Sequence, residues 1–200
     1  MERQTIIFVH GGQGCGKSTV TNLLREKMTH TTLFRLAGVP TNQEEPHIAS
    51  LRYHMAMLEG VNQSRGSGMN FIFDRSYLCE KVYANLGFKP HSFEEECRVI
   101  TNGIETLAKS FNIYFVLLTA TERTLTHRLK RDGKPQFEDV KFSAENSLKQ
   151  QMEYLYEFDY LPETVGMMTV PTDNMGAEEV ADFIIERIFK LEQHEEKGEV

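Results

Sequence analysis

The sequence predicts an α/β fold in which helices cover both faces of a five-stranded parallel sheet. The first observation behind it is that five short apolar segments alternate with segments whose apolar residues recur at helical spacing. The second is the length of 200 residues, which suits one domain, with 40% hydrophobic and 26% charged residues. No internal repeat or linker divides the chain, so we expect a single domain over residues 1–193 and a charged tail at 194–200.

Five short apolar runs are the predicted strands. Their bounds are Ile6–Val9, Thr32–Leu36, Asn70–Phe73, Ile113–Leu118 and Met167–Val170. The first run ends at a cluster of glycines, and the third ends at Asp74. Because ligands gather at the carboxyl ends of parallel strands, we expect the glycines and Asp74 to share one edge of the sheet.

Apolar residues at helical spacing predict the helices that connect and follow these strands. The spacing occurs in the segments Val20–Met28, Ile48–Leu58, Phe93–Phe111, Leu125–Leu129, Leu148–Leu155 and Val180–Leu191. Ser92 and Glu95 have the spacing of a capping box, which predicts that the third of these helices begins there.

Charge and composition exclude several classes of function. The net charge is −7, whereas binding to a nucleic acid polymer relies on clustered lysine and arginine. The cysteines at 15, 79 and 97 are too widely spaced to indicate a disulfide framework or a zinc site. No apolar run has the length of a signal peptide or a membrane span. We therefore expect a cytoplasmic protein that contacts neither a membrane nor a nucleic acid polymer.

The most specific motif lies between the first predicted strand and the first predicted helix. Residues Gly11-Gly12-Gln13-Gly14-Cys15-Gly16-Lys17-Ser18 match GxxxxGK[ST] at every position, and Thr19 follows. The glycines permit backbone conformations in which successive N–H groups converge on phosphate oxygens. The following helix directs its positive dipole end at the same anion, and Lys17 reaches the β- and γ-phosphates. The motif predicts a phosphate-binding loop (P-loop) for ATP.

Two residues are candidate ligands of Mg²⁺. The Ser18 hydroxyl occupies the position that ligates the metal in this type of loop. Asp74 ends the third predicted strand, so its carboxylate is expected at the same sheet edge. The sequence therefore predicts a MgATP site. The alternative for Asp74 is a solvated residue that caps the next helix.

Two segments resemble motifs of the thymidylate kinase and deoxynucleoside kinase group of P-loop kinases. Phe34-Arg35-Leu36-Ala37-Gly38 lies where thymidylate kinases carry TREPG. The segment from Asp74-Arg75-Ser76 to Tyr83 resembles their DRYxxSxxAY, and its first three residues also resemble the ERS of deoxynucleoside kinases.

The resemblance continues toward the C-terminus. Arg123, Arg128 and Arg131 resemble the arginine-bearing lid of the group, and Pro171–Asn174 lies where the group places its loop near adenine. The resemblance covers residues 5–190. It implies the three-layer P-loop kinase fold with a short lid, ATP and Mg²⁺ as cofactors, and a homodimer formed through helices near residues 92–111.

The resemblance also implies a role for each basic residue of the site. Arg35 would hold the 5′-phosphate of the acceptor, and Arg75 would lie between the donor and acceptor phosphates. Together with Lys17, a lid arginine (Arg128 or Arg131) would act on the transferring γ-phosphoryl group. Asp173 would lie near adenine. Arginine suits these roles because its fixed fork makes bidentate contacts with phosphate oxygens. The alternative for each arginine is a surface residue paired with a nearby acid.

The acceptor base and sugar are expected between the helix at 48–58 and the helix after Asp74. The candidate residues for holding them are Arg52, Tyr77, Tyr83, Arg98 and Asn102. Tyr83 is favoured because it aligns with a tyrosine of the group, although a tyrosine at the core edge of an amphipathic helix is the alternative.

Two departures from the thymidylate kinase pattern bear on the reaction. Gln13 replaces the aspartate of the loop, and Leu36 replaces the glutamate of REPG. A nucleoside acceptor needs a carboxylate base for its 5′-hydroxyl, whereas a monophosphate acceptor is already an anion. The loss of the glutamate therefore favours a monophosphate, unless Glu44 or Glu45 takes over its role.

The resulting hypothesis is a kinase that transfers the γ-phosphoryl group of MgATP to a deoxynucleoside monophosphate, with a thymidylate-like acceptor favoured. The alternatives are a deoxynucleoside kinase, a kinase for a modified pyrimidine or another small metabolite, and a non-catalytic nucleotide-binding regulator. We also expect the lid segment Arg128–Phe142 to be mobile without nucleotide, since it is charged and contains Gly and Pro.

Overall fold

The structure, a computed structural model, describes residues 3–36, 45–132 and 143–196. In this part of the chain a single sheet runs in the order β2-β3-β1-β4-β5, and all four neighbouring pairs are parallel. The strands are β1 (Gln4–His10), β2 (Thr31–Arg35), β3 (Asn70–Asp74), β4 (Phe111–Thr119) and β5 (Gly166–Pro171). Each coincides with a predicted run to within a residue or two at either end, so the predicted five-stranded parallel sheet is confirmed.

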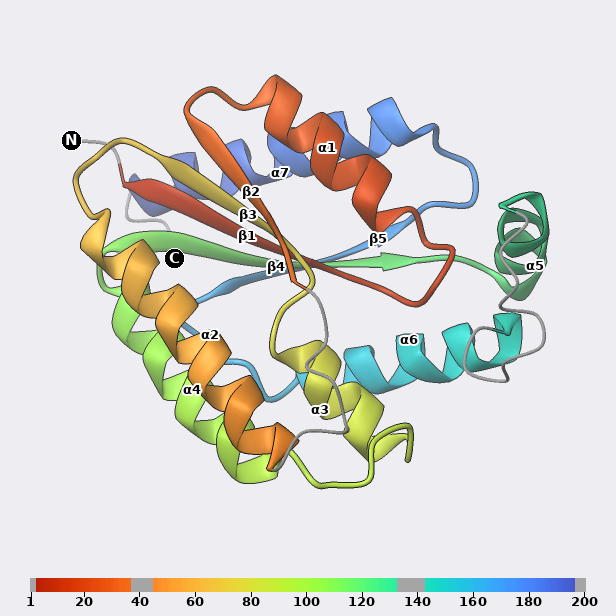
Figure 1. Cartoon of the computed structure of the whole chain (residues 1–200). Helices are drawn as coiled ribbons and strands as arrows, with labels where there is room; N and C mark the ends of the chain where they lie inside the picture. Colours follow the sequence, from red (N-terminus) through yellow and green to blue (C-terminus); the bar gives the residue numbers. More distant parts are fainter. Residues whose placement is uncertain (1–2, 37–44, 133–142, 197–200) are drawn as a thin grey trace.

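Helices cover both faces of the sheet (Figure 1). They are α1 (Lys17–Lys27), α2 (Pro46–Gln63), α3 (Leu78–Asn85), α4 (Glu94–Ala108), α5 (Glu122–Arg131), α6 (Ala144–Phe158) and α7 (Ala177–Glu196). The helices α1 and α7 pack together on one face, while α2 packs against α4 and α3 against α6 on the other. The predicted three-layer arrangement is therefore confirmed.

The central strand β1 explains why the sheet needs two layers of helices. Its side chains alternate between the faces, so Ile6 and Phe8 belong to the core beneath α2, α3, α4 and α6, while Ile7 and Val9 belong to the core beneath α1 and α7. All four are almost completely buried. Burying each such side chain stabilises the fold by about 1.5–3 kcal/mol, so neither helical layer is dispensable.

The predicted capping box at the start of α4 is wrong. The helix begins at Glu94, and no side chain caps it. The residue that precedes it, Phe93, is fully buried in the core. The Ser92 hydroxyl lies one position too early and accepts a 3.4 Å hydrogen bond from the Glu94 N–H instead of bonding Glu95. The burial of Phe93 therefore decides where this helix begins.

The last helix differs from the predicted tail. α7 continues to Glu196, so residues 194–196 of the expected tail at 194–200 are helical, and residues 197–200 lie outside the described part of the chain. None of the helices in the described residues is both long enough and apolar enough to cross a membrane.

Candidate functional site

The glycine-rich loop connects the end of β1 to the start of α1. Gly11, Gly14 and Gly16 have φ angles of 145°, 84° and 88°, a region that favours glycine. Gly16 is the N-cap of α1, and no side chain caps the helix. The first N–H groups of α1 thus have no capping side chain, and the loop has the geometry that binds an anion.

Close packing is a second reason why the first two residues of the loop are glycines. A Cβ atom on Gly11 would lie 2.5 Å from the carbonyl oxygen of Leu118, and one on Gly12 would lie 2.5 Å from that of Ser147. The loop therefore lies directly against β4 and the N-terminal turn of α6. Two elements distant in the sequence fix its position.

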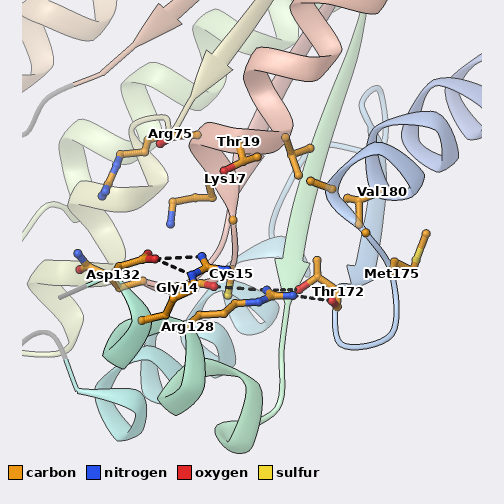
Figure 2. A pocket seen from close by; sticks show the side chains of 17 residues that line it. Gly14, Cys15, Lys17, Thr19, Arg75, Arg128, Asp132, Thr172, Met175 and Val180 are labelled. Carbon is orange, nitrogen blue, oxygen red and sulfur yellow. Dashed lines mark hydrogen bonds and ion pairs between the residues drawn. The ribbon is translucent and has the colours of Figure 1, made fainter. Parts of the chain in front are cut away.

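A cavity of about 490 Å³ lies against this loop (Figure 2). Loop residues 13–19 form one wall, together with Arg75 from the end of β3 and Arg128 and Arg131 from α5. The other wall comes from the turn after β5 and the start of α7. Its residues are Thr172, Met175, Gly176, Ala177 and Val180. The structure thus brings most of the predicted phosphate-binding residues to one cavity.

Lys17 is the buried cation of the loop. Its ammonium group donates hydrogen bonds of 2.8 Å to the carbonyl oxygens of Gly11 and Gly12, and its side chain is 7% exposed. Burial lowers the pKa of Lys17, and the positive charge of Arg75 lowers it further. The ammonium is held by backbone carbonyls that a phosphate oxygen could replace as its partner.

Ser18 and Asp74 meet as the sequence predicts. The Ser18 hydroxyl donates a 2.6 Å hydrogen bond to one carboxylate oxygen of Asp74, which is 4% exposed. The other carboxylate oxygen, Oδ1, is buried and has no hydrogen-bond partner in the described part of the chain. A hydroxyl and a free carboxylate oxygen are the hard ligands that Mg²⁺ takes in phosphate sites, where waters and phosphates complete its shell. These two residues therefore fit a Mg²⁺ ion.

Arg75 has a strained backbone at the edge of the sheet. Its φ angle is 84°, which is uncommon for a residue with a side chain, and its N–H donates a 3.0 Å hydrogen bond to the Val9 carbonyl. The guanidinium lines the cavity near Lys17 (Figure 2). Such strain persists only where surrounding structure imposes it, and it is concentrated at functional sites.

Tyr83 lies beside Arg75. Burial raises the pKa of the Tyr83 hydroxyl, and the charge of Arg75 and a hydrogen bond with it act in the opposite direction. Cys79, one turn earlier on α3, accepts a 3.0 Å hydrogen bond from the Tyr154 hydroxyl. This face of α3 therefore supports the arginine.

The predicted lid arginines differ in how firmly they are held. Arg128 donates to both the hydroxyl and the carbonyl of Thr172, at 2.9 and 2.7 Å, and more weakly to the Gly14 carbonyl at 3.4 Å. Arg131 lines the same cavity but is 65% exposed and pairs with Asp132 at 2.9 Å. Arg128 thus joins α5, the loop and the residue after β5, while Arg131 is exposed and makes no such link among the described contacts.

The predicted site residues that do not line this cavity include Arg35, Arg52 and Asp173. Arg35 is level with Asp74 in the sheet, but it is exposed and donates to the Asn22 side chain at 2.5 Å. Arg52 is exposed on α2. The Asp173 carboxylate accepts hydrogen bonds of 2.9 and 2.7 Å from the N–H and hydroxyl of Thr121, which ties the turn after β5 to the start of α5.

Three other residues predicted to hold the acceptor do not line the cavity at the phosphate loop. Tyr77, Arg98 and Asn102 line a second cavity, between α3, α4 and α6. Glu44, residues 37–38 of the TREPG-like segment and most of the predicted mobile lid (residues 133–142) lie outside the described residues.

Sequence reasoning missed one buried pair behind the loop. His10, the residue before Gly11, is fully buried, and its Nε2 lies 2.6 Å from the Ser76 hydroxyl. The same hydroxyl accepts a hydrogen bond from the Leu78 N–H at 3.2 Å. The pair joins the start of the loop to the residue after Arg75. A histidine at the end of an apolar strand was the only signal for it in the sequence.

Solved structures share this fold at low sequence identity. Deoxyadenosine kinase from M. mycoides with bound dCTP is 16% identical, with a TM-score of 0.56 over 93% of this chain and 100% of that chain. Thymidylate kinase from Candida albicans is 14% identical, with a TM-score of 0.62 over 96% and 94% of the two chains. Polyphosphate kinase 2 from Arthrobacter aurescens TC1 is 16% identical, with a TM-score of 0.66 over 94% and 69%.

No protein-family model matches the sequence, and no curated protein matches it either. The likeness to solved structures therefore concerns the fold. The parallel sheet carries a phosphate-binding loop after its central strand, as expected for the fold of the three similar kinases. This chain has the P-loop kinase fold.

Proposed function

We propose that the protein is a kinase that transfers the γ-phosphoryl group of MgATP to a deoxynucleoside monophosphate. The observation that carries the proposal is the convergence of the loop, Lys17, Arg75 and Arg128 on one cavity of about 490 Å³. Phosphoryl transfer requires little proton chemistry and relies on cations placed around the transferring oxygens. A site that only stored a nucleotide would not need cations from three separate elements.

Each residue has a role that its position supports. The loop amides and Lys17 bind the donor phosphates, and the apolar start of α7 (Met175, Val180) gives the adenine ring a surface. Arg75 neutralises charge on the transferring group, and Arg131, which is exposed, moves in to assist. Ser18 and Asp74 hold Mg²⁺. Bound there, Mg²⁺ would neutralise negative charge on the β- and γ-phosphates.

The choice of a monophosphate acceptor rests on the end of β2. Leu36, which replaces the glutamate of the similar kinases, is buried and belongs to the hydrophobic core. An apolar side chain there supplies no base for a 5′-hydroxyl, whereas a phosphate oxygen needs none. Arg35, Arg52 and Tyr83 are the proposed contacts of the acceptor, and a thymidylate-like base is favoured by the resemblance of the Asp74–Tyr83 segment.

A deoxynucleoside kinase is the second candidate. The fold likeness to a deoxyadenosine kinase favours it. Glu45, just before α2, has a φ angle of 50° and is the described carboxylate nearest in the sequence to the missing base.

An acceptor screen tests the proposal. ADP release from MgATP would be measured with each deoxynucleoside monophosphate, ribonucleoside monophosphate and nucleoside, with Lys17→Ala as the inactive control. Turnover with monophosphates supports the proposal. Turnover with nucleosides alone replaces it by the second candidate. If none of the tested compounds is phosphorylated, a nucleotide-binding regulator is favoured.

A further inference from the structure

A second cavity, of about 430 Å³, opens between α3, α4 and α6, and the proposed activity does not use it. Its walls come from residues at helical spacing. On α3 these are Leu78, Lys81 and Asn85, and on α4 they include Cys97 and Thr101. One face of each helix therefore points to the same space, whose volume lies in the range of small-molecule sites.

This cavity lies behind the reaction site. The face of α3 that carries Cys79 and Tyr83 interacts with Arg75, while Leu78, Lys81 and Asn85 lie on other positions of the same short helix. The described residues that line the two cavities do not overlap. A ligand in the second cavity would thus be one helix away from Arg75 and out of contact with the phosphate-binding loop.

Neutral and charged polar groups converge at the base of the second cavity. The Tyr77 and Thr101 hydroxyls lie 3.1 Å apart, and Tyr77 is 1% exposed. The Asn85 amide donates a 2.9 Å hydrogen bond to Glu157, a carboxylate at the opposite wall that is 6% exposed. Burial raises the pKa of Glu157. A few buried polar groups in a concave site are the features that fix the orientation of a small ligand.

Two aromatic rings form the outer rim. Tyr156 and Tyr160 line the cavity and are 54% and 65% exposed, which is unusual for side chains with large apolar rings. Their ring centroids are 4.9 Å apart, and a 2.9 Å hydrogen bond joins their hydroxyls. Because the two ring planes are tilted by 58°, a planar ligand ring can stack on one tyrosine while the other flanks its edge.

The charges of the lining argue against a phosphorylated ligand. Lys81 is paired with Glu94, and Arg98 is paired with Glu95 at 2.7 Å. Both cations of the described lining thus already have carboxylate partners, whose negative charge opposes a phosphate. An uncharged ligand leaves both pairs intact.

We propose that the cavity between α3, α4 and α6 is a second ligand site, which binds an uncharged nitrogen heterocycle of nucleoside size. The ring stacks on Tyr160, and Tyr156, whose plane is tilted by 58° to that of Tyr160, flanks the edge of the ligand. Its polar edge is bound by Asn85, Asn102 and the Thr101 hydroxyl.

Chemical-shift mapping tests this directly and needs no turnover. Uniformly ¹⁵N-labelled protein would be titrated with thymidine, deoxycytidine, deoxyadenosine and deoxyguanosine. We expect saturable shifts at the amides of Asn85, Thr101 and Asn102 with at least one nucleoside. Thymidine 5′-monophosphate is expected to bind this cavity at least tenfold more weakly than thymidine, because both cations are paired.

Variants assign the shifts to the cavity. Tyr160→Ala is expected to weaken binding about tenfold through lost stacking, and Asn102→Ala to weaken it about fivefold. Met152→Ala is the matched control, since Met152 is 64% exposed on the same helix and lies outside the described lining. All three positions tolerate truncation because they are exposed.

Four results would overturn the proposal. They are shifts confined to the amides around Arg75 and Tyr83, the absence of saturable shifts with all four nucleosides, unchanged affinity in both variants, and equal affinity for thymidine and its monophosphate. The first of these would place the nucleoside in the proposed acceptor site and leave the proposed kinase activity standing. Conversely, binding at Thr101 by a protein that turns over no acceptor would support this site while the proposed function failed.

Discussion

The two sides of the proposed reaction site, a phosphate side and an acceptor side, are built in different ways. The phosphate side, formed by residues 11–19 with Asp74 and Arg75, is largely contiguous in the sequence. Hydrogen bonds of 2.8–3.0 Å to backbone carbonyls hold it, together with the 2.6 Å hydrogen bond between the Ser18 and Asp74 side chains. The acceptor side, formed by the end of β2, by α2 and by Tyr83, depends on side chains from separate elements. Two of these, Arg35 and Arg52, are exposed.

This difference shows where specificity resides. Backbone amides and a buried lysine recognise phosphate oxygens that every nucleotide shares, so this side needs little variation. Exposed arginines on α2 and β2 can be replaced without disturbing the core, so we expect the choice of acceptor to be made on this side. The predictions below test the contrast, from the largest expected effect to the smallest.

Lys17→Ala is expected to have the largest effect. Removing the buried cation of the phosphate side should lower kcat about 10³-fold, equivalent to about 4 kcal/mol of transition-state stabilisation. ADP release with MgATP and the best acceptor measures it. Lys27→Ala, at the other end of α1, is the control, because Lys27 forms surface ion pairs with Glu178 and Asp182 and should change kcat by less than about twofold. An equal fall in kcat in Lys17→Ala and Lys27→Ala would contradict the proposed role of the phosphate side.

Asp74→Asn should lower kcat about 100-fold, or about 2.7 kcal/mol, and raise the Mg²⁺ concentration needed for half-maximal rate. The reason is that the unpartnered carboxylate oxygen loses its charge while the hydrogen bond to Ser18 is retained. Titration of the rate with Mg²⁺ measures both changes. Asp182→Asn, on the exposed face of α7, is the control. An unchanged Mg²⁺ midpoint in Asp74→Asn would remove Asp74 from the metal site.

Gly12→Ala tests how tightly the phosphate side is packed. The added Cβ would meet the Ser147 carbonyl at 2.5 Å, so the free energy of unfolding should fall by about 2 kcal/mol. Gly60→Ala in α2 is the matched control, since no atom lies within 4 Å of its Cβ position and alanine favours the helix, and it should stabilise by about 0.5–1 kcal/mol. Urea unfolding measures both. Equal free energies of unfolding in the two variants would show that the loop can shift to accommodate the added Cβ atom at little cost.

The pH dependence of stability compares a buried histidine on each side. Burial lowers the pKa of His10, behind the loop, to about 3, and that of His54, on α2, to about 4, from 6.5. The unfolded chain therefore binds more protons below pH 6.5, so this stability is complete above that pH and is lost as the pH falls. At about pH 5 each histidine should cost about 2 kcal/mol.

Urea unfolding at about pH 7.5 and about pH 5 measures this loss. His10→Gln and His54→Gln should each reduce the loss by about 2 kcal/mol relative to the wild type. Either variant alone is informative if the other does not fold. The same loss in a folded variant as in the wild type would mean that its histidine is charged in the native state.

The acceptor side should give the smallest effects. Arg35→Ala and Arg52→Ala are each expected to raise KM for the acceptor about tenfold, or about 1.4 kcal/mol, with KM for ATP unchanged. Arg25→Ala, exposed on α1, is the control. If KM for ATP rises instead, these arginines belong to the donor, and the assignment of the two sides is reversed.

The sequence alone determined the five strands, their alternation with helices along the chain, and the phosphate loop. Strands such as β4 are continuous apolar runs, and the loop is a contiguous motif, so both follow from local backbone preference and burial. The start of α4 was mispredicted because the burial of Phe93, a tertiary effect, overrode a local capping pattern.

Only the tertiary structure decided how distant side chains combine. Arg128 binds Thr172, which is 44 positions away, and His10 contacts Ser76, which is 66 positions away. The strained backbone of Arg75 is likewise hydrogen-bonded to Val9, 66 positions away. It also separated Tyr77 and Asn102 from the reaction site, since they line a different cavity. Periodicity predicts that a helix forms, but which neighbour each of its faces meets depends on packing between helices, which is set by the whole fold.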